Sequence, residues 1–472
     1  MKKSKALFGF VITLSLLTLI GCKQNDDGKN TVSEDNISVT AGVSPTVTVK
    51  PTDTEEKVDE VDLLELSKEY ANQFVKLDFK KVVENSTEEI KKQVSEEYLK
   101  SVWQSTVEAL GEFIDIKSQD METEGDTTVV KTVMEFEENG LLLTLSYDKE
   151  QQVKGIWFSY QALEEEVQSE KFTEYDISVG HGDLLLDGKL TLPNGVSKPP
   201  VVILVQGSGS TDLDETIGAV SNKPFRDIAH GLAERGIASI RYNKRFYQYA
   251  DKATDRFTIY DEVLDDVSYA IDLAATDERV DGSKIYVIGH SLGGMLAPKI
   301  ATDNPEVAGI VSLAGSPRHL EDIILDQVTD ALELQTNLTE EDKAYTLSQY
   351  NEMIQSIKNI DNENLGDAIL GATGYYWKSL NEIDTKSLVK ELKIPMLFLQ
   401  GSEDFQVYAD VDFEEWKTIL EGNENASFVL YEGLNHLFMQ SNGLSDTKEY
   451  DIKGNVDSKV IEDIAEWISI RE

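Results

Sequence analysis

The stretch KIYVIGHSLGGMLAP, residues 284–298, constrains the fold of this chain more than any other part of the sequence. Its apolar run Ile285–Ile288 predicts a buried strand, and a helix-compatible segment follows. Between them, Gly289, Ser291 and Gly293 form the pattern Gly-x-Ser-x-Gly, in which a serine occupies a sharp strand-to-helix turn. The two glycines let neighbouring backbone approach that turn closely. The pattern makes Ser291 a candidate nucleophile, whereas a chance match or a purely structural turn would lack partner residues elsewhere.

The first residues have the pattern of a secretory signal. Three lysines among the first five residues precede the apolar run Ala6–Ile20, which is too short to cross a bilayer comfortably. The sequence Leu-Ile-Gly-Cys that ends at Cys22 resembles the bacterial lipobox, and the resemblance implies removal of residues 1–21 and a lipid on Cys22. Cys22 is the only cysteine, which fits lipid attachment and excludes an intramolecular disulfide. We therefore expect a lipid anchor on the extracytoplasmic face of a bacterial cell membrane, the alternative being an ordinary signal peptide with an incidental cysteine.

The net charge limits the partners of this chain. Its 44 Lys and Arg residues face 87 Asp and Glu residues, which gives a formal charge of -43. Such an acidic surface repels nucleic acid and argues against polyanionic substrates. Residues 22–60 are rich in Asn, Asp, Thr and Ser and have no helical period, so we expect a disordered tether there.

Residues 61–163 predict a small α+β domain. Apolar residues recur at helical spacing from Val61 and again in a region from Glu88 to Phe113. Three strand-like runs follow, at residues 127–137, 140–148 and 152–160. The arrangement resembles the cone-shaped, nuclear-transport-factor-like (cystatin-like) domain that precedes some bacterial serine hydrolases. The domain has no histidine or cysteine, so a spacer or a binding module is expected.

Residues 174–472 predict an α/β domain. Strands alternate with helices, which indicates a mostly parallel sheet with helices on both faces. An insertion of helical character, residues 317–393, interrupts the alternation and predicts a cap. Its aromatic residues either line an acyl pocket or form the core of the cap itself: Tyr375, Tyr376 and Trp377.

Candidate partners for Ser291 follow two later strands. A serine hydroxyl needs a base to remove its proton and an acid to orient that base. His436 lies in a loop after a predicted strand, and Asp404 follows the preceding strand, with Glu403 as the competing acid. The order Ser, Asp, His resembles the α/β-hydrolase superfamily, particularly bacterial carboxylesterases and acyl hydrolases with a helical cap. The resemblance implies catalysis by Ser291, His436 and Asp404.

Two backbone amides are expected to form the oxyanion hole. Leu292 follows the serine on the helix, and Ser208 lies in the loop after the apolar strand Val201–Val205. This loop begins with Gln206-Gly207 where family members often have His-Gly, which puts the anchoring of the loop in question. Two charged clusters near this loop either pair to fix it or belong to unrelated solvated loops: Asp212, Asp214 and Glu215, and Arg241, Lys244 and Arg245.

These features predict a membrane-tethered extracytoplasmic serine hydrolase that cleaves carboxylic esters of small molecules, without cofactor or metal. Two alternatives use the same machinery: an amide or peptide hydrolase similar to serine aminopeptidases, and an acyl thioesterase. An alternative of another class is a ligand-binding lipoprotein whose hydrolase domain is inert.

Overall fold

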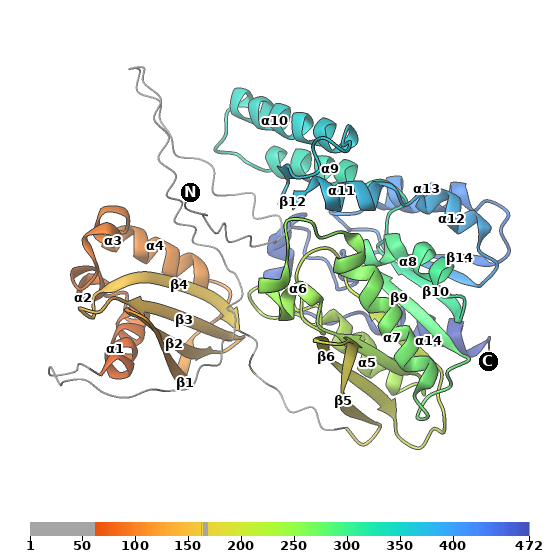
Figure 1. Cartoon of the computed structure of the whole chain (residues 1–472), viewed down its shortest axis with the longest axis horizontal. Coiled ribbons are helices and arrows are strands. Elements are labelled where there is room, and N and C mark those ends of the chain that lie inside the picture. Colours follow the sequence, from red (N-terminus) through yellow and green to blue (C-terminus); the bar gives the residue numbers. More distant parts are fainter. Residues whose placement is uncertain (1–61, 162, 164–168, 472) are drawn as a thin grey trace.

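The computed structural model describes residues 62–161, 163 and 169–471, which form a small N-terminal domain and a larger α/β domain (Figure 1). The predicted signal peptide, Cys22 and the predicted tether lie outside these residues. Within the described residues, no helix combines the length and the apolar character needed to cross a membrane.

The N-terminal domain packs four helices against a four-stranded antiparallel sheet of order β1-β2-β3-β4. In β2 buried residues alternate with half-buried ones, so one face of the sheet is covered. Tyr70 and Phe74 of α1 and Trp103 of α4 belong to the core on that face. The elements are α1 (Leu63–Val75), α2 (Lys80–Glu84), α3 (Glu88–Gln93), α4 (Glu96–Val107), β1 (Phe113–Glu124), β2 (Thr127–Phe136), β3 (Gly140–Tyr147) and β4 (Val153–Gln161).

Strand β1 is not predicted from the sequence. The helical pattern was expected to reach Phe113, where the structure instead begins a twelve-residue strand. Most of this strand is exposed, and its sequence FIDIKSQDMETE has no alternation of apolar and polar residues. As an edge strand it is held by backbone pairing with β2, so burial leaves no period-two pattern in its sequence.

The larger domain is built on an eight-stranded sheet of order β14-β13-β10-β9-β7-β8-β6-β5. The first six strands in this order, β14 to β8, are parallel to one another. The last two, β6 and β5, are antiparallel and form one edge. The predicted α/β class with a mostly parallel sheet is confirmed. The strands are β5 (Phe172–His181), β6 (Leu184–Pro193), β7 (Val201–Val205), β8 (Ala238–Tyr242), β9 (Ile285–His290), β10 (Val307–Leu313), β13 (Met396–Gly401) and β14 (Ala426–Tyr431).

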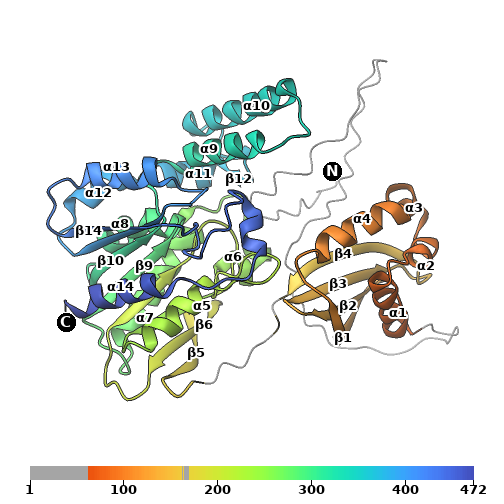
Figure 2. The same ribbon diagram turned by 180° about the vertical axis from the view of Figure 1, so that it is seen from behind.

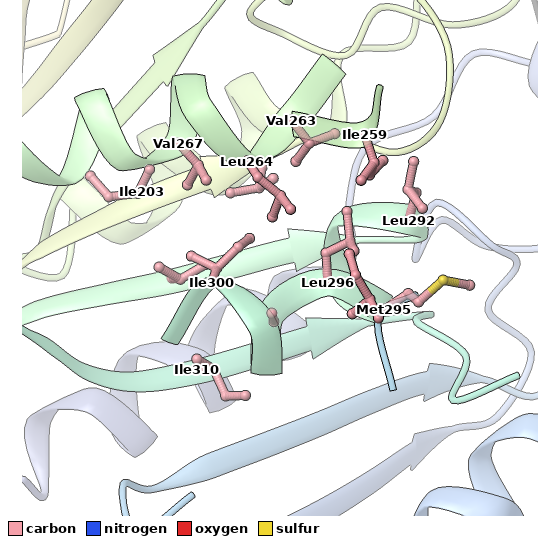
Figure 3. Packing of buried hydrophobic residues seen from close by; sticks show 14 of the residues in the cluster. Ile203, Ile259, Val263, Leu264, Val267, Leu292, Met295, Leu296, Ile300 and Ile310 are labelled. Carbon is pink, nitrogen blue, oxygen red and sulfur yellow. The ribbon is translucent and has the colours of Figure 1, made fainter. Parts of the chain in front are cut away.

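Helices cover both faces of this sheet because the side chains of its central strands alternate between two cores. Val202 and Leu204 of β7 face one core, which α5 (Pro224–Ala233) and α14 (Ser458–Ser469) cover. Their neighbours on β7 face the other core, under α7 (Asp265–Thr276) and α8 (Leu292–Asp303), which Figure 3 shows from close by. Shorter elements complete this domain: α6 (Arg245–Gln248), η1 (Ala250–Lys252), η2 (Tyr260–Leu264), η3 (Ala409–Phe413), α13 (Glu414–Ile419) and η4 (Thr447–Asp451).

The insertion between β10 and β13 forms a helical layer along one side of the α/β domain, at the top of Figures 1 and 2. Its apolar residues join the core that also contains α7 and α8, so the insertion is packed onto the domain. Helix α10 begins at a capping box formed by Thr339 and Asp342. The elements are α9 (Leu320–Glu333), α10 (Glu340–Lys358), β11 (Ala368–Ile369), β12 (Ala372–Thr373), α11 (Gly374–Asn381) and α12 (Thr385–Glu391).

The packing of α8 predicts a stability difference between two alanine substitutions on this helix. Ile300 is fully buried, so Ile300→Ala leaves a cavity and should cost about 2–5 kcal/mol of unfolding free energy. Thr302→Ala, at an exposed position two residues away, should change the stability by only about 0.5 kcal/mol. Calorimetric melting temperatures of the two variants measure the difference. Equal melting temperatures would contradict the described core.

Candidate active site

Ser291 occupies a strained turn between β9 and α8. Its backbone has φ 52° and ψ -113°, which lies outside the regions that L-residues ordinarily adopt. Such a conformation costs about 1–3 kcal/mol and persists only where its surroundings enforce it. Here the Ser291 N–H donates to the carbonyl oxygen of Leu313 at 2.9 Å, and its own carbonyl accepts from Met295 N at 2.9 Å. The turn leaves the Ser291 side chain partly exposed at the carboxyl end of β9.

The two glycines of the motif are required by close approach of backbone. A Cβ atom at Gly289 would lie 2.1 Å from the carbonyl oxygen of Gly293. At Gly293 it would lie 2.3 Å from the carbonyl oxygen of Val205, at the end of β7. Real contacts of this kind are never so short, so any side chain here would displace the turn from the sheet. The pattern in the sequence therefore has a steric basis in the fold.

His436 and Asp404 meet at the carboxyl ends of β14 and β13. His436 Nδ1 lies 2.8 Å from Asp404 Oδ2, and both side chains are almost completely buried. The same carboxylate accepts hydrogen bonds from Gln400 Nε2 and from the backbone N–H groups of Gln406 and Val407. These donors compensate for burying the charge. Glu403, the competing acid, is exposed.

The pairing with Asp404 fixes the tautomer of the His436 ring. A carboxylate only accepts hydrogen bonds, so Nδ1 carries a proton and Nε2 of the neutral ring is free to accept one. Within the described residues the Ser291 hydroxyl makes no hydrogen bond, either to His436 or to any other group. The arrangement supplies a base, and an acid that orients it.

His290 connects the serine turn to the loop that carries His436. Its Nε2 donates to the carbonyl oxygen of His436 at 3.0 Å, and the two ring centroids are 4.7 Å apart. Its Nδ1 lies 3.0 Å from Glu215 Oε1. Burial disfavours the charged ring, but Glu215 and the His436 carbonyl oxygen outweigh burial and raise the pKa of His290. With an acceptor at each nitrogen, the surroundings favour the doubly protonated ring.

The loop after β7 is held by buried carboxylates on both sides of Ser208. Gly207 N donates to Glu215 Oε1 at 2.6 Å, and Gly209 N donates to Glu262 Oε1 at 3.0 Å. Lys244 Nζ bridges Glu262 Oε1 and the carbonyl oxygen of Gly207, at 2.7 Å to each. A Cβ atom at Gly207 would lie 3.2 Å from Ser291 Cβ, so this loop passes directly beside the serine.

The two amides predicted for the oxyanion hole are left without acceptors. Within the described part of the chain, neither Ser208 N nor Leu292 N donates to a protein oxygen, whereas the N–H groups of Gly207 and Gly209 are occupied. Gln206, which replaces the more frequent histidine, anchors the loop because its side-chain amide donates to the carbonyl oxygen of Tyr242. The loop is therefore fixed in spite of the departure from the family pattern.

Only part of the charge pairing near this loop was foreseen. Of the two clusters considered in the sequence, Arg241 pairs with Asp214 at 2.8 Å. Arg241 also pairs with Glu174, and the pKa of Glu174 falls to about 2 because its bonds to His230 and Arg241 outweigh burial. Lys244 instead pairs with Glu262 in the short π-helix η2, and this pair was not predicted from the sequence. No spacing rule connects Glu262 to a loop more than fifty residues earlier in the chain.

The three cap aromatics occupy different environments. Tyr376 and Trp377 are fully buried in the main core, and Trp377 Nε1 donates to the carbonyl oxygen of Ile369 at 2.8 Å. Burial and the nearby Glu262 carboxylate raise the pKa of Tyr376 well above its usual range. Tyr375 is partly exposed, with the Arg256 guanidinium 5.8 Å from its ring centre. The structure thus gives Tyr376 and Trp377 a packing role.

No metal site is formed within residues 62–161, 163 and 169–471, since no three His, Cys, Asp or Glu side chains there are placed to share an ion. The charged groups near Ser291 are instead paired with one another or with backbone amides.

Two protein families match this chain. Residues 67–156 match a family described as a protein of unknown function (DUF3887), and residues 220–441 match the family described as Serine aminopeptidase, S33. Among solved structures, Est1E from Butyrivibrio proteoclasticus is 19% identical with a TM-score of 0.40, covering 62% of this chain and 99% of its own. The Pyrococcus furiosus esterase Pf2001 is 17% identical with a TM-score of 0.40, covering 63% and 92%.

One related protein matches most of the sequence. Esterase EstD of Thermotoga maritima is 35% identical over 398 residues, which cover 83% of this chain and 91% of that protein. The match is too long for the α/β domain alone and therefore extends into the N-terminal domain. The superfamily predicted from the serine motif is confirmed. The chain belongs to the α/β-hydrolase family that includes Esterase EstD, and it is a hydrolase.

Proposed function

We propose that this chain hydrolyses carboxylic esters of small molecules through Ser291, His436 and Asp404. The observation that carries the proposal is the strained Ser291 turn at the same sheet edge as the buried His436–Asp404 pair. Such strain clusters at sites of function, and the turn has the sequence and backbone of a nucleophile elbow. Esterase EstD, the relative at 35% identity, supports an ester as the substrate.

In the proposed reaction, Ser291 Oγ attacks the ester carbonyl carbon while His436 Nε2 accepts the serine proton. Asp404 holds the ring through Nδ1 and stabilises its positive charge. The alcohol leaves as the C–O bond breaks, and it takes the proton from His436. Water then attacks the acyl-serine while His436 takes its proton. The bond between the acyl carbon and Ser291 Oγ breaks, His436 returns the proton to Oγ, and the acid is released.

The N–H groups of Leu292 and Ser208 are proposed to stabilise the oxyanion in both steps. Donors that already point at the reacting oxygen need no reorganisation during the reaction, and this lowers the barrier. Glu215, Glu262 and Lys244 supply that rigidity for the Ser208 side of the hole.

The acyl group is proposed to bind beneath the cap. A cavity of about 290 Å³ lies between the serine helix and the insertion. Its apolar lining includes Met295, one helical turn after Ser291, together with Leu320 and Leu380 of the cap. Charged side chains such as Arg318 and Lys386 also line the cavity, and Ser291 lies outside its lining. Tyr375 does not line this cavity, but it is the cap aromatic that remains partly exposed, so it is the aromatic we propose for substrate contact.

A second candidate is amide hydrolysis on the same machinery, because residues 220–441 match a family described as a serine aminopeptidase. A panel of p-nitrophenyl esters, acyl thioesters and aminoacyl anilides separates the three reactions. Faster turnover of anilides or thioesters than of matched esters would overturn the ester proposal. No turnover of any of them would favour a binding protein with an inert hydrolase domain.

We propose further that the protein is anchored by a lipid on Cys22 at the extracytoplasmic face of a bacterial membrane. The support is the lipobox-like sequence that ends at Cys22 and the absence of any other cysteine from the sequence.

Replacing Ser291 with alanine tests the nucleophile. Ser291→Ala should lower kcat by a factor of about 10⁴ or more, because only binding and the oxyanion hole remain. A fluorophosphonate probe should label the native chain at Ser291 and should not label the variant. Ser283→Ala, at an exposed turn, serves as the control and should keep full activity. Labelling at another serine would disprove the assignment.

Two cap substitutions test substrate selection. Tyr375→Ala should change the ratio of kcat/KM between short and long acyl esters at a nearly constant melting temperature. Trp377→Ala should cost about 3–5 kcal/mol of stability, because this side chain is fully buried, and should leave the ratio unchanged. An unchanged ratio in Tyr375→Ala would show that this side chain does not contact the acyl group.

Replacing Cys22 with serine tests the anchor. Cys22→Ser should release the protein from the membrane or leave it unprocessed, while ester hydrolysis persists because the catalytic residues lie far along the chain. Fractionation and mass spectrometry of the N-terminus measure both effects. Normal processing together with equal membrane retention would contradict lipidation at Cys22.

A further inference from the structure

A short hairpin of the α/β domain reaches the N-terminal domain. Ile217 and Asn222 exchange two backbone hydrogen bonds of 2.9 Å and enclose the turn 218–221. We call residues 217–222 the docking hairpin. In both overall views, one end of the four-stranded sheet is turned toward the larger domain (Figures 1 and 2).

The N-terminal domain holds the tip of the docking hairpin with buried contacts. Asn139, in the turn between β2 and β3, is only 4% exposed. Its Nδ2 donates to the carbonyl oxygen of Ala219 at 2.7 Å and to Ser221 Oγ at 2.6 Å. Ala219 is fully buried and packs in the hydrophobic core of the N-terminal domain. The core of one domain is thus completed by a residue of the other.

The base of the docking hairpin leads directly to the candidate active site. Glu215 lies two residues before Ile217, and its Oε1 accepts from Gly207 N and from His290 Nδ1. Its backbone has φ 53°, a left-handed conformation that a non-glycine residue keeps only when its surroundings enforce it. Ser221, at the other end of the hairpin, has φ 51°. A change in the position of the hairpin would therefore be transmitted to this carboxylate.

A second connection runs from the docking hairpin to the loop after β13 that carries Asp404. Asn222 Nδ2 donates to the carbonyl oxygen of Tyr450 at 2.9 Å, and Ala219 N donates to Asp451 Oδ1 at 2.7 Å. The Tyr450 hydroxyl contacts the side chain of Gln406, whose backbone N–H donates to Asp404. The hairpin therefore connects Glu215, which holds the loop after β7, with Gln406, which donates to Asp404.

We propose that the N-terminal domain is an intramolecular positioning domain. It holds the docking hairpin and thereby fixes Glu215, the loop of His436 and the loop after β7 that carries Ser208, which we call the oxyanion loop. The proposal rests on the ester hydrolysis proposed above, for which these loops supply the machinery. The proposal gives a role to a domain that matches a family described as of unknown function. Asn139 acts through the hairpin and does not touch the substrate, so it is a positioning residue.

A matched pair of asparagine substitutions in the full chain tests the proposal. Asn139→Asp keeps the shape of the side chain but turns an oxygen toward the Ala219 carbonyl, so it should release the hairpin. Asn85→Asp is the control: its Nδ2 also donates to two oxygens, of Tyr70 and Gln151, but both lie within the N-terminal domain. Both variants disturb this domain, and only Asn139→Asp disturbs its contact with the hairpin.

We expect Asn139→Asp to lower kcat by a factor of about ten or more and to change KM by less than about threefold, because the oxyanion contacts act in the transition state. The rate of fluorophosphonate labelling should fall with kcat. Amide hydrogen exchange in residues 206–222 should rise at the same time. Asn85→Asp should keep the native kcat and the native exchange in this segment, even where its melting temperature falls equally.

Ser221→Ala is a milder variant for use if Asn139→Asp does not fold. It removes one acceptor of Asn139, and a double-mutant cycle with Asn139→Ala should show effects on kcat that are clearly less than additive. The positioning role is overturned if kcat and exchange in Asn139→Asp match those of Asn85→Asp, or if the cycle is additive. A native chain without ester turnover would contradict the proposed function instead, and the exchange measurement would still test the docking.

Discussion

A single carboxylate oxygen, Glu215 Oε1, is the point on which the candidate active site depends. It accepts from the backbone of the oxyanion loop and from His290, whose other nitrogen holds the backbone of His436. The nucleophile, the base and one oxyanion donor come from three separate loops, and this oxygen joins all three. Each of these bonds joins polar groups in a buried setting, where an unpaired partner is costly. The loops are therefore restricted to one relative arrangement.

In this strongly acidic chain, several Arg and Lys side chains near the oxyanion loop are buried in ion pairs. Arg241 lies in β8, Lys244 and Arg245 follow this strand, and all three are buried and paired with carboxylates. Buried ion pairs often add little net stability, because desolvation cancels much of the attraction. Such pairs do restrict the relative positions of the segments that carry them, because each cation must stay close to its partners. For Lys244 this restriction falls on the backbone beside Ser208, because its Nζ also donates to the carbonyl oxygen of Gly207.

The parts of the fold that were predictable are those governed by local pattern. The serine turn was recognisable because Gly289 and Gly293 are required by contacts within the motif and with the neighbouring strand. His436 and Asp404 stood out because they follow apolar strands, and parallel strands bring their carboxyl ends to one edge. Strand β1, Glu262 and Asn139 were not predicted as parts of these arrangements. Their roles depend on edge pairing or on partners many residues away, for which a single sequence has no period or spacing.

The burial of Ala219 in the N-terminal domain also bears on the order in which the chain acquires its structure. A ribosome makes the chain from the N-terminus, and domains fold as units in that order. The four-stranded sheet is complete at Gln161, before the docking hairpin has been synthesised. The first domain therefore offers a preformed surface to the hairpin when it emerges. In this sense the small domain is a template on which part of the larger one is assembled.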